Sequence, residues 1–133
     1  MATTRIQKEY LDDELVDKTT AQTLTNKRNT KRVLNLGSSA TPTINTDLYD
    51  VVNITGLAVD ITSMTTNLSG TPTDGQRLRI NYTGTAARAI THGASFTNGV
   101  VALPITTVTT TRLSVLYEYD GAVFRSMASG STA

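Results

Sequence analysis

The chain ends in two alternating runs of apolar and polar residues with an Asp-Gly pair between them. The runs are Leu113–Tyr119 and Ala122–Met127, separated by Asp120-Gly121. Asp-Gly is typical of a two-residue β-hairpin turn, because a type I′ turn needs a positive φ at both central positions. The turn predicts three pairs across the hairpin: Tyr119 with Ala122, Tyr117 with Phe124, and Val115 with Ser126. An antiparallel pair of strands at this end is the strongest constraint on the fold.

The two faces of the predicted hairpin differ in polarity. Five apolar or aromatic residues share one face, which we expect to turn to the core: Leu113, Val115, Tyr117, Tyr119 and Phe124. The other face mixes apolar and charged residues: Leu116, Glu118, Val123, Arg125 and Met127. Leu116, Val123 and Met127 make it more apolar than a monomer surface usually is. We therefore expect a neighbouring subunit or the chain's own N-terminal segment to cover it.

The composition favours an all-β domain. At 133 residues the chain is long enough for one core and an additional arm, but not for two independent cores. Only 5% of the residues are aromatic, so the core must consist mainly of Val, Ile and Leu. The many threonines are β-branched and favour strands. There is no cysteine, which excludes a disulfide framework and thiol chemistry.

Strand signals recur along the middle of the chain. The clearest is Gln76–Thr83, where Leu78, Ile80 and Tyr82 alternate with polar residues. Further candidates are 31–36, 48–54, 57–61, 64–68, 88–92, 99–103 and 106–111, and the short gap at Thr55-Gly56 predicts a hairpin there. A spacing of roughly 8 to 12 residues is typical of an antiparallel β-sandwich or jelly-roll-like domain. No repeat of fixed period is found.

Residues 1–30 differ from the rest, and we expect an arm there followed by the β-sandwich domain at 31–133. Ile6–Val16 is compatible with a helix, but its two apolar pairs would point roughly 140° apart. Such a segment either packs between neighbours or stays mobile in the free protein. The residues expected to dock the arm are Ile6, Tyr10, Leu11, Leu15 and Leu24.

The charge distribution argues against a membrane or nucleic acid as partner. The formal net charge is +1, so no global field attracts the protein to anionic polymers. Lys27–Arg32 is basic and follows the acidic Asp12–Glu14, which favours a solvated link or charge pairing between subunits over phosphate binding. Neither a signal peptide nor an apolar run of about 18 residues occurs, so we expect a cytoplasm-like compartment.

No motif predicts catalysis, a cofactor or a metal. His92 is the only histidine, and no ligand or catalytic partner is spelled out near it, so we expect a ring packed at a strand end. The adjacent carboxylates of Asp12–Glu14 would not converge on one ion, and an ionic contact between subunits is the better reading. Neither a nucleophile elbow nor a phosphate-binding loop is present. We therefore expect a protein that is not an enzyme.

Three arginines are candidates for a binding face. Arg77, Arg79 and Arg88, together with Tyr82, could contact an acidic sugar or a negatively charged protein surface. Basic residues on the wet side of a strand also serve as solubilising or edge-protecting groups. Both interpretations stay open from the sequence.

Several Thr- and Gly-rich stretches resemble a known family. Ser69–Ile80, Gly84–Phe96 and Leu103–Val108 resemble a β domain of structural proteins of tailed bacteriophages, and Thr19–Lys27 resembles the connector that precedes it in phage fibre proteins. The resemblance covers about residues 19–127. It implies a non-enzymatic virion component, a homotrimer that contacts capsid or tail proteins and assembles in the host cytoplasm.

The length of the chain bears on which virion part the resemblance implies. Fibre proteins are typically long, whereas 133 residues suit a capsid decoration, a small head fibre or an adaptor or part of a tail fibre. The alternative is a module that binds a host receptor or glycan through the loops 69–75 and 93–99.

Overall fold

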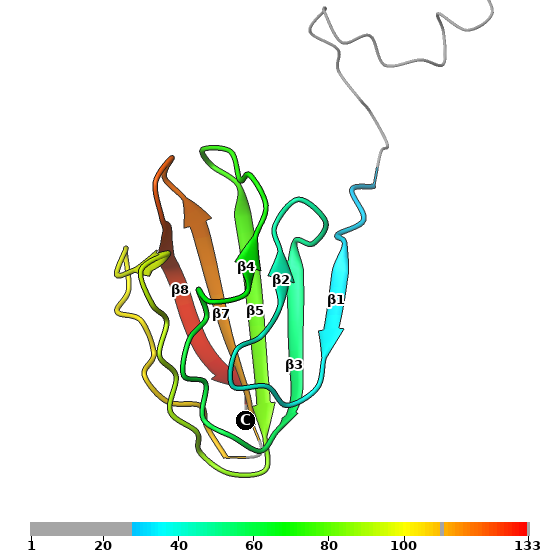
Figure 1. The fold of residues 1–133 in the computed structure, drawn as a ribbon, viewed down its shortest axis with the longest axis vertical. Helices are drawn as coiled ribbons and strands as arrows, with labels where there is room; N and C mark the ends of the chain where they lie inside the picture. The colour runs from blue at the N-terminus through cyan, green and yellow to red at the C-terminus, as the bar shows by residue number, and fades with distance from the viewer. Residues whose placement is uncertain (1–27, 110, 133) are drawn as a thin grey trace, which may run out of the picture. The chain divides into compact units, whose positions relative to one another are not determined.

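The computed structural model describes residues 28–109 and 111–132, and the chain divides into two units between Thr30 and Lys31. The second unit confirms the all-β expectation: its described residues form strands and contain no helix (Figure 1). The strands are β1 (Val33–Leu36), β2 (Ile44–Asn45), β3 (Val51–Leu57), β4 (Leu68–Ser69), β5 (Arg77–Gly84), β6 (Phe96–Thr97), β7 (Arg112–Tyr119) and β8 (Phe124–Thr132). The predicted docking residues of the arm, Ile6, Tyr10, Leu11, Leu15 and Leu24, lie outside the described residues.

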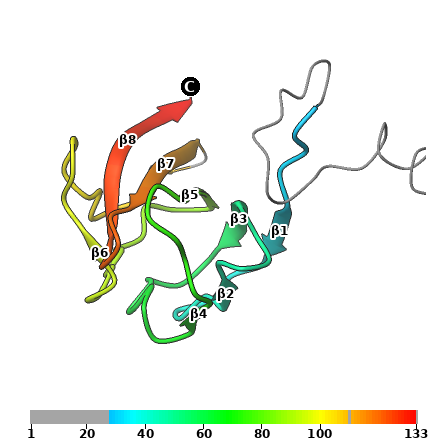
Figure 2. The same ribbon diagram turned by 90° about the horizontal axis from the view of Figure 1, so that it is seen from above.

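The strands form a curled mixed sheet and a small second sheet. The large sheet has the order β1-β3-β5-β7-β8-β6, and β2 pairs with β4. Figure 2 shows the curl of the large sheet, with β2 and β4 on the side of the core. The expectation of antiparallel pairing is confirmed for β5–β7 and β7–β8. It is wrong for β1–β3, β3–β5, β2–β4 and β6–β8, which are parallel.

The parallel pairs arise because the first part of the chain winds in stacked coils. It alternates between the two sheets, so that β3 lies beside β1 and β4 beside β2. Backbone bonds also join the connecting loops of successive coils, for example from Thr62 N to Ala40 O (2.8 Å) and from Ile61 N to Ala89 O (2.9 Å). The hairpin predicted at Thr55-Gly56 is therefore wrong. The chain continues through Gly56 to the end of β3 and crosses to the other sheet.

A single core joins the two sheets. The alternation predicted for β5 is confirmed, since Leu78, Ile80 and Tyr82 are fully buried. Val52 and Ile54 of β3 belong to the same cluster, and Ile44 of β2 joins it from the small sheet. Burying an aliphatic or aromatic side chain contributes about 1.5–3 kcal/mol, so this cluster is the main source of stability.

The C-terminal hairpin forms with a different register from the predicted one. Tyr119 pairs with Phe124 instead of Ala122, and the turn holds four residues. The Asp120 side chain explains this turn, because its Oδ1 accepts hydrogen bonds from the N–H groups of Ala122 (3.0 Å) and Val123 (2.8 Å). The register moves by two residues, so each side chain keeps its face.

The inner face of this hairpin is confirmed. Leu113, Val115, Tyr117 and Phe124 are buried, and Tyr119 packs against the core while partly exposed. Further along, Tyr117 pairs with Ser126 and Leu116 with Ala128, so Met127 is the extra residue of a β-bulge.

Candidate functional site

The outer face of the large sheet, which turns away from the core, carries side chains in transverse rows. Each row crosses neighbouring strands because β1, β3 and β5 are paired in register and β7 and β8 continue the pairing. One row is mostly apolar: Val33, Val51, Arg79, Leu116 and Ala128. The next row is polar: Asn35, Asn53, Asn81, Ser114 and Gly130.

The polar row is a chain of side-chain hydrogen bonds, which we name the asparagine ladder (Asn35, Asn53, Asn81 and Ser114). Asn81 Nδ2 donates to Asn53 Oδ1 (2.8 Å), and Asn53 Nδ2 donates to Asn35 Oδ1 (2.9 Å). Ser114 Oγ donates to Asn81 Oδ1 (2.7 Å). These bonds join four strands in one register, and Asn81, in the middle of the ladder, is 3% exposed.

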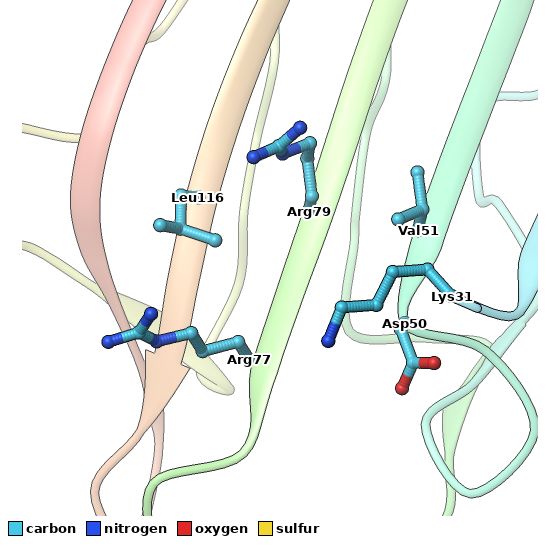
Figure 3. A pocket seen from close by; sticks show the side chains of 6 residues that line it. All are labelled: Lys31, Asp50, Val51, Arg77, Arg79 and Leu116. Carbon is cyan, nitrogen blue, oxygen red and sulfur yellow. The ribbon is translucent and has the colours of Figure 1, made fainter. Parts of the chain in front are cut away.

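Beside the apolar row the surface is hollowed (Figure 3). The hollow has a volume of about 210 Å³ and is lined by Lys31, Asp50, Val51, Arg77, Arg79 and Leu116. A second, adjoining hollow of about 370 Å³ shares Arg79 and Leu116 and extends over β7 and β8 as far as Thr132. We call the two together the outer groove. Its floor is aliphatic and its rim is basic.

The outer groove carries uncompensated positive charge. Arg77 Nε pairs with Glu118 Oε2 at 2.9 Å. Asp50 accepts two bonds from the Arg32 guanidinium, and these bonds lower the pKa of this carboxyl to about 2. Lys31 and Arg79 form no ion pair with any described residue. An anionic group of a partner would therefore be attracted to their end of the groove.

The structure brings together only part of the residues expected to bind. Arg77 and Arg79 meet in the outer groove, as their spacing along one strand predicts. Arg88 does not line it. Arg88 lies in the loop after β5, where its N–H donates to Thr107 Oγ1 and its C=O accepts from Thr107 N, in the segment between β6 and β7. Lys31 and Asp50 were missed, because they reach the groove from loops that precede β1 and β3.

The three apolar residues of the hairpin's outer face are separated. Leu116 lies in the outer groove, Val123 lies in the turn, and Met127 lines another hollow of about 440 Å³ next to Val100. The bulge separates Met127 from Leu116, because Leu116 pairs with Ala128 and the extra residue has no partner on β7. That this face is covered in an assembly stays a prediction.

His92 lies in the core with the aromatic residues. It is 6% exposed, its Nε2 is 3.1 Å from Tyr117 Oη, and the Phe96 ring packs edge-on at 6.0 Å. Burial lowers the pKa of the imidazole to about 4. The placement agrees with the packed ring expected from the sequence.

The described residues, 28–109 and 111–132, contain neither a cluster of metal-ligand side chains nor a helix that could cross a membrane. No three His, Cys, Asp or Glu side chains of this part gather as a metal site would require. No helix of this part is long and apolar enough to cross a membrane.

Comparisons with protein-family models, curated proteins and solved structures found no match.

Proposed function

We propose that this protein is a non-enzymatic structural component of a tailed-phage virion. In this proposal a sandwich-like β module forms a homotrimer, and residues 1–30 attach it to capsid or tail proteins. It acts as a capsid decoration, a head fibre, or a tail fibre or adaptor part, and it is assembled in the host cytoplasm. The resemblance of Ser69–Ile80 and Gly84–Phe96 to phage structural proteins supports the virion assignment.

The outer groove is the observation that carries a role in assembly. Val51 and Leu116 form a half-buried aliphatic floor beside Arg79, on the face of the sheet that is exposed to solvent in the single chain. Protein interfaces combine an apolar centre with arginine and are depleted in lysine and acidic residues at that centre. The groove has this composition at Arg79 and Leu116, with Lys31 on its rim.

Light scattering of the full chain tests the proposal. We expect the wild type to have the mass of a trimer and Leu116→Asp to dissociate, because a carboxylate would be buried in the apolar contact. Val100→Asp is the control, since Val100 is 74% exposed and lies outside the outer groove. Electron microscopy of intact virions then places the protein on head or tail. A monomeric wild type that binds host glycans would contradict the structural role.

The alternative is a module that binds a host receptor or carbohydrate. The gathering of Arg77, Arg79 and Lys31 in one hollow favours it, because these cations could bind the carboxylate of an acidic sugar. A glycan array with the wild type and Arg79→Gln distinguishes the two. Binding of acidic glycans that Arg79→Gln abolishes, in a protein that stays monomeric, would favour the alternative.

A further inference from the structure

On one side of the parallel strands the large sheet continues, and on the other side it ends. Beyond β5 the antiparallel strands β7 and β8 continue the large sheet, but β1 is its edge on the other side (Figure 2). β2 belongs to the same coil as β1 and pairs only with β4. β1 and β2 of the first coil are therefore each paired on one side only, and no described residue forms a strand on their other side.

The backbone of β1 offers hydrogen-bonding groups at this edge. Arg32 O accepts from Val51 N (3.1 Å), so residues 32, 34 and 36 direct their peptide groups to β3. Because these groups alternate along a strand, the N–H and C=O of Val33 and Asn35 point away from the sheet. Within the described residues no hydrogen bond uses them.

The side chains at the edge are equally incomplete. Asn35 ends the asparagine ladder: its Oδ1 accepts from Asn53, and its Nδ2 has no acceptor among the described residues. Leu34 and Leu36 are only partly buried at the end of the core, and Val33 is 48% exposed. Lys31, which precedes the strand, forms no ion pair with any described residue, and the carboxylate that it acts on electrostatically, Asp50, is held by the Arg32 guanidinium.

We propose that β1 binds an extended segment of a partner polypeptide, which adds as a further parallel strand. β3 shows the chemistry such a segment needs. Asp50 meets a cation at the start, Val52 and Ile54 face the core, and Asn53 joins the ladder. The partner segment therefore carries a carboxylate for Lys31, then alternating aliphatic residues, with an asparagine or serine acceptor opposite Asn35.

A partner fits this edge better than a second copy of the chain. Among the described residues, the edge strands that a second copy could supply are β1 (Val33–Leu36) and β6 (Phe96–Thr97) of the large sheet and β2 (Ile44–Asn45) and β4 (Leu68–Ser69) of the small sheet. None of them contains a carboxylate for Lys31, and β2, β4 and β6 have only two residues each. The inference does not depend on the virion proposal, because strand addition is measured on the isolated protein.

Hydrogen exchange of the full-length, ¹⁵N-labelled chain tests the proposal. The probe is a synthetic peptide with the sequence of residues 49–56, and a scrambled peptide of the same composition is the control. We expect the first peptide to slow exchange of the Val33 and Asn35 amides by roughly tenfold or more. Leu34 and Leu36, already bonded to β3, should change little. No slowing with the first peptide, or equal slowing with both peptides, would overturn the proposal.

Two variants make the test specific. Val33→Pro removes an outward N–H without touching the β1–β3 bonds, and proline is tolerated in edge strands. It should abolish the effect of the peptide on Asn35, while unchanged β5 and β7 signals show that the variant is folded. Asn35→Ala should weaken peptide binding about 2- to 10-fold, the value of one hydrogen bond. Wild-type affinity in both variants would contradict the proposal. Protection that depends on protein concentration, without peptide, would overturn it in favour of a second copy.

Discussion

At the residue scale, the buried His92 couples the stability of the fold to pH. Its folded pKa of about 4 lies below the unfolded value of about 6.5, so the unfolded chain binds the proton first. The stabilisation is complete above pH 6.5 and is lost as the pH falls toward 4. At 1.36 kcal/mol per unit, we expect a loss on the order of 3 kcal/mol. Urea unfolding between pH 7.5 and about 4 measures it.

His92→Phe is the matched control for this loss. It keeps an aromatic ring in the pocket between Phe96 and Tyr117 but cannot be protonated. Its free energy of unfolding should stay flat through the histidine window. Both proteins should still lose stability at lower pH. Arg32 lowers the folded pKa of Asp50 from 3.8 to about 2, so the unfolded chain binds this proton first as the pH falls. An equal loss in wild type and His92→Phe between pH 7 and 5 would show that another group is responsible.

At the element scale, the asparagine ladder holds the parallel strands in register. Asn81 is its most buried member, and Asn81→Ala would leave Asn53 Oδ1 and the Ser114 hydroxyl without their partner. We expect a loss of about 2 kcal/mol in chemical unfolding. Asn35→Ala is the control, because Asn35 is exposed at the edge, and it should cost less than about 1 kcal/mol. Equal effects at the two positions would mean that the ladder adds no stability.

Gly70 lies in the tight loop between β4 and β5. Gly70 has φ +109°, and a Cβ there would collide with Thr46 Oγ1 and lie 3.0 Å from the backbone N of Asp47. Gly70→Ala should therefore cost about 3 kcal/mol, from backbone strain and overpacking. Gly75→Ala separates the two terms: its φ is +81° but nothing lies within 4 Å, so about 1–2 kcal/mol is expected. Thermal unfolding that ranks the two variants equally would rule out the steric contribution.

The buried faces of β5 and of the C-terminal hairpin could be predicted from the sequence, but the partners of the strands could not. Alternation follows from the pleat, so Leu78, Ile80 and Tyr82 were placed correctly. The hairpin register was predicted wrongly, because the Asp120 carboxylate stabilises a longer turn than the Asp-Gly pair alone implies. The parallel pairing had a signal that was missed: an asparagine between two apolar residues recurs at Asn35, Asn53 and Asn81. The intervals are 18 and 28 residues, so a search for a fixed period does not find it.

At the scale of the whole unit, the candidate site is made by the topology. Arg77 and Arg79 share a face by alternation alone and could be predicted together. Lys31, Asp50 and Leu116 join them only because β1, β3, β5 and β7 lie side by side. These residues are far apart in the sequence. The strand order that brings them together depends on long connecting loops, and no local sequence pattern predicts that order. The groove therefore follows from the order of the strands, which the sequence pattern leaves open.

The same strand order predicts a gradient of stability across the sheet. β5 and β7 have neighbours on both sides and bury Ile80, Tyr82 and Val115, so their amides should exchange only on global unfolding. At the edge, Leu34 and Leu36 should be partly protected, whereas Val33 and Asn35 should exchange close to the rate of an open chain. Native-state hydrogen exchange of the dilute full chain measures this alternation. It separates two states of the molecule: slow exchange of Val33 and Asn35 would mean that the edge is already covered, while fast exchange leaves it available for a partner strand.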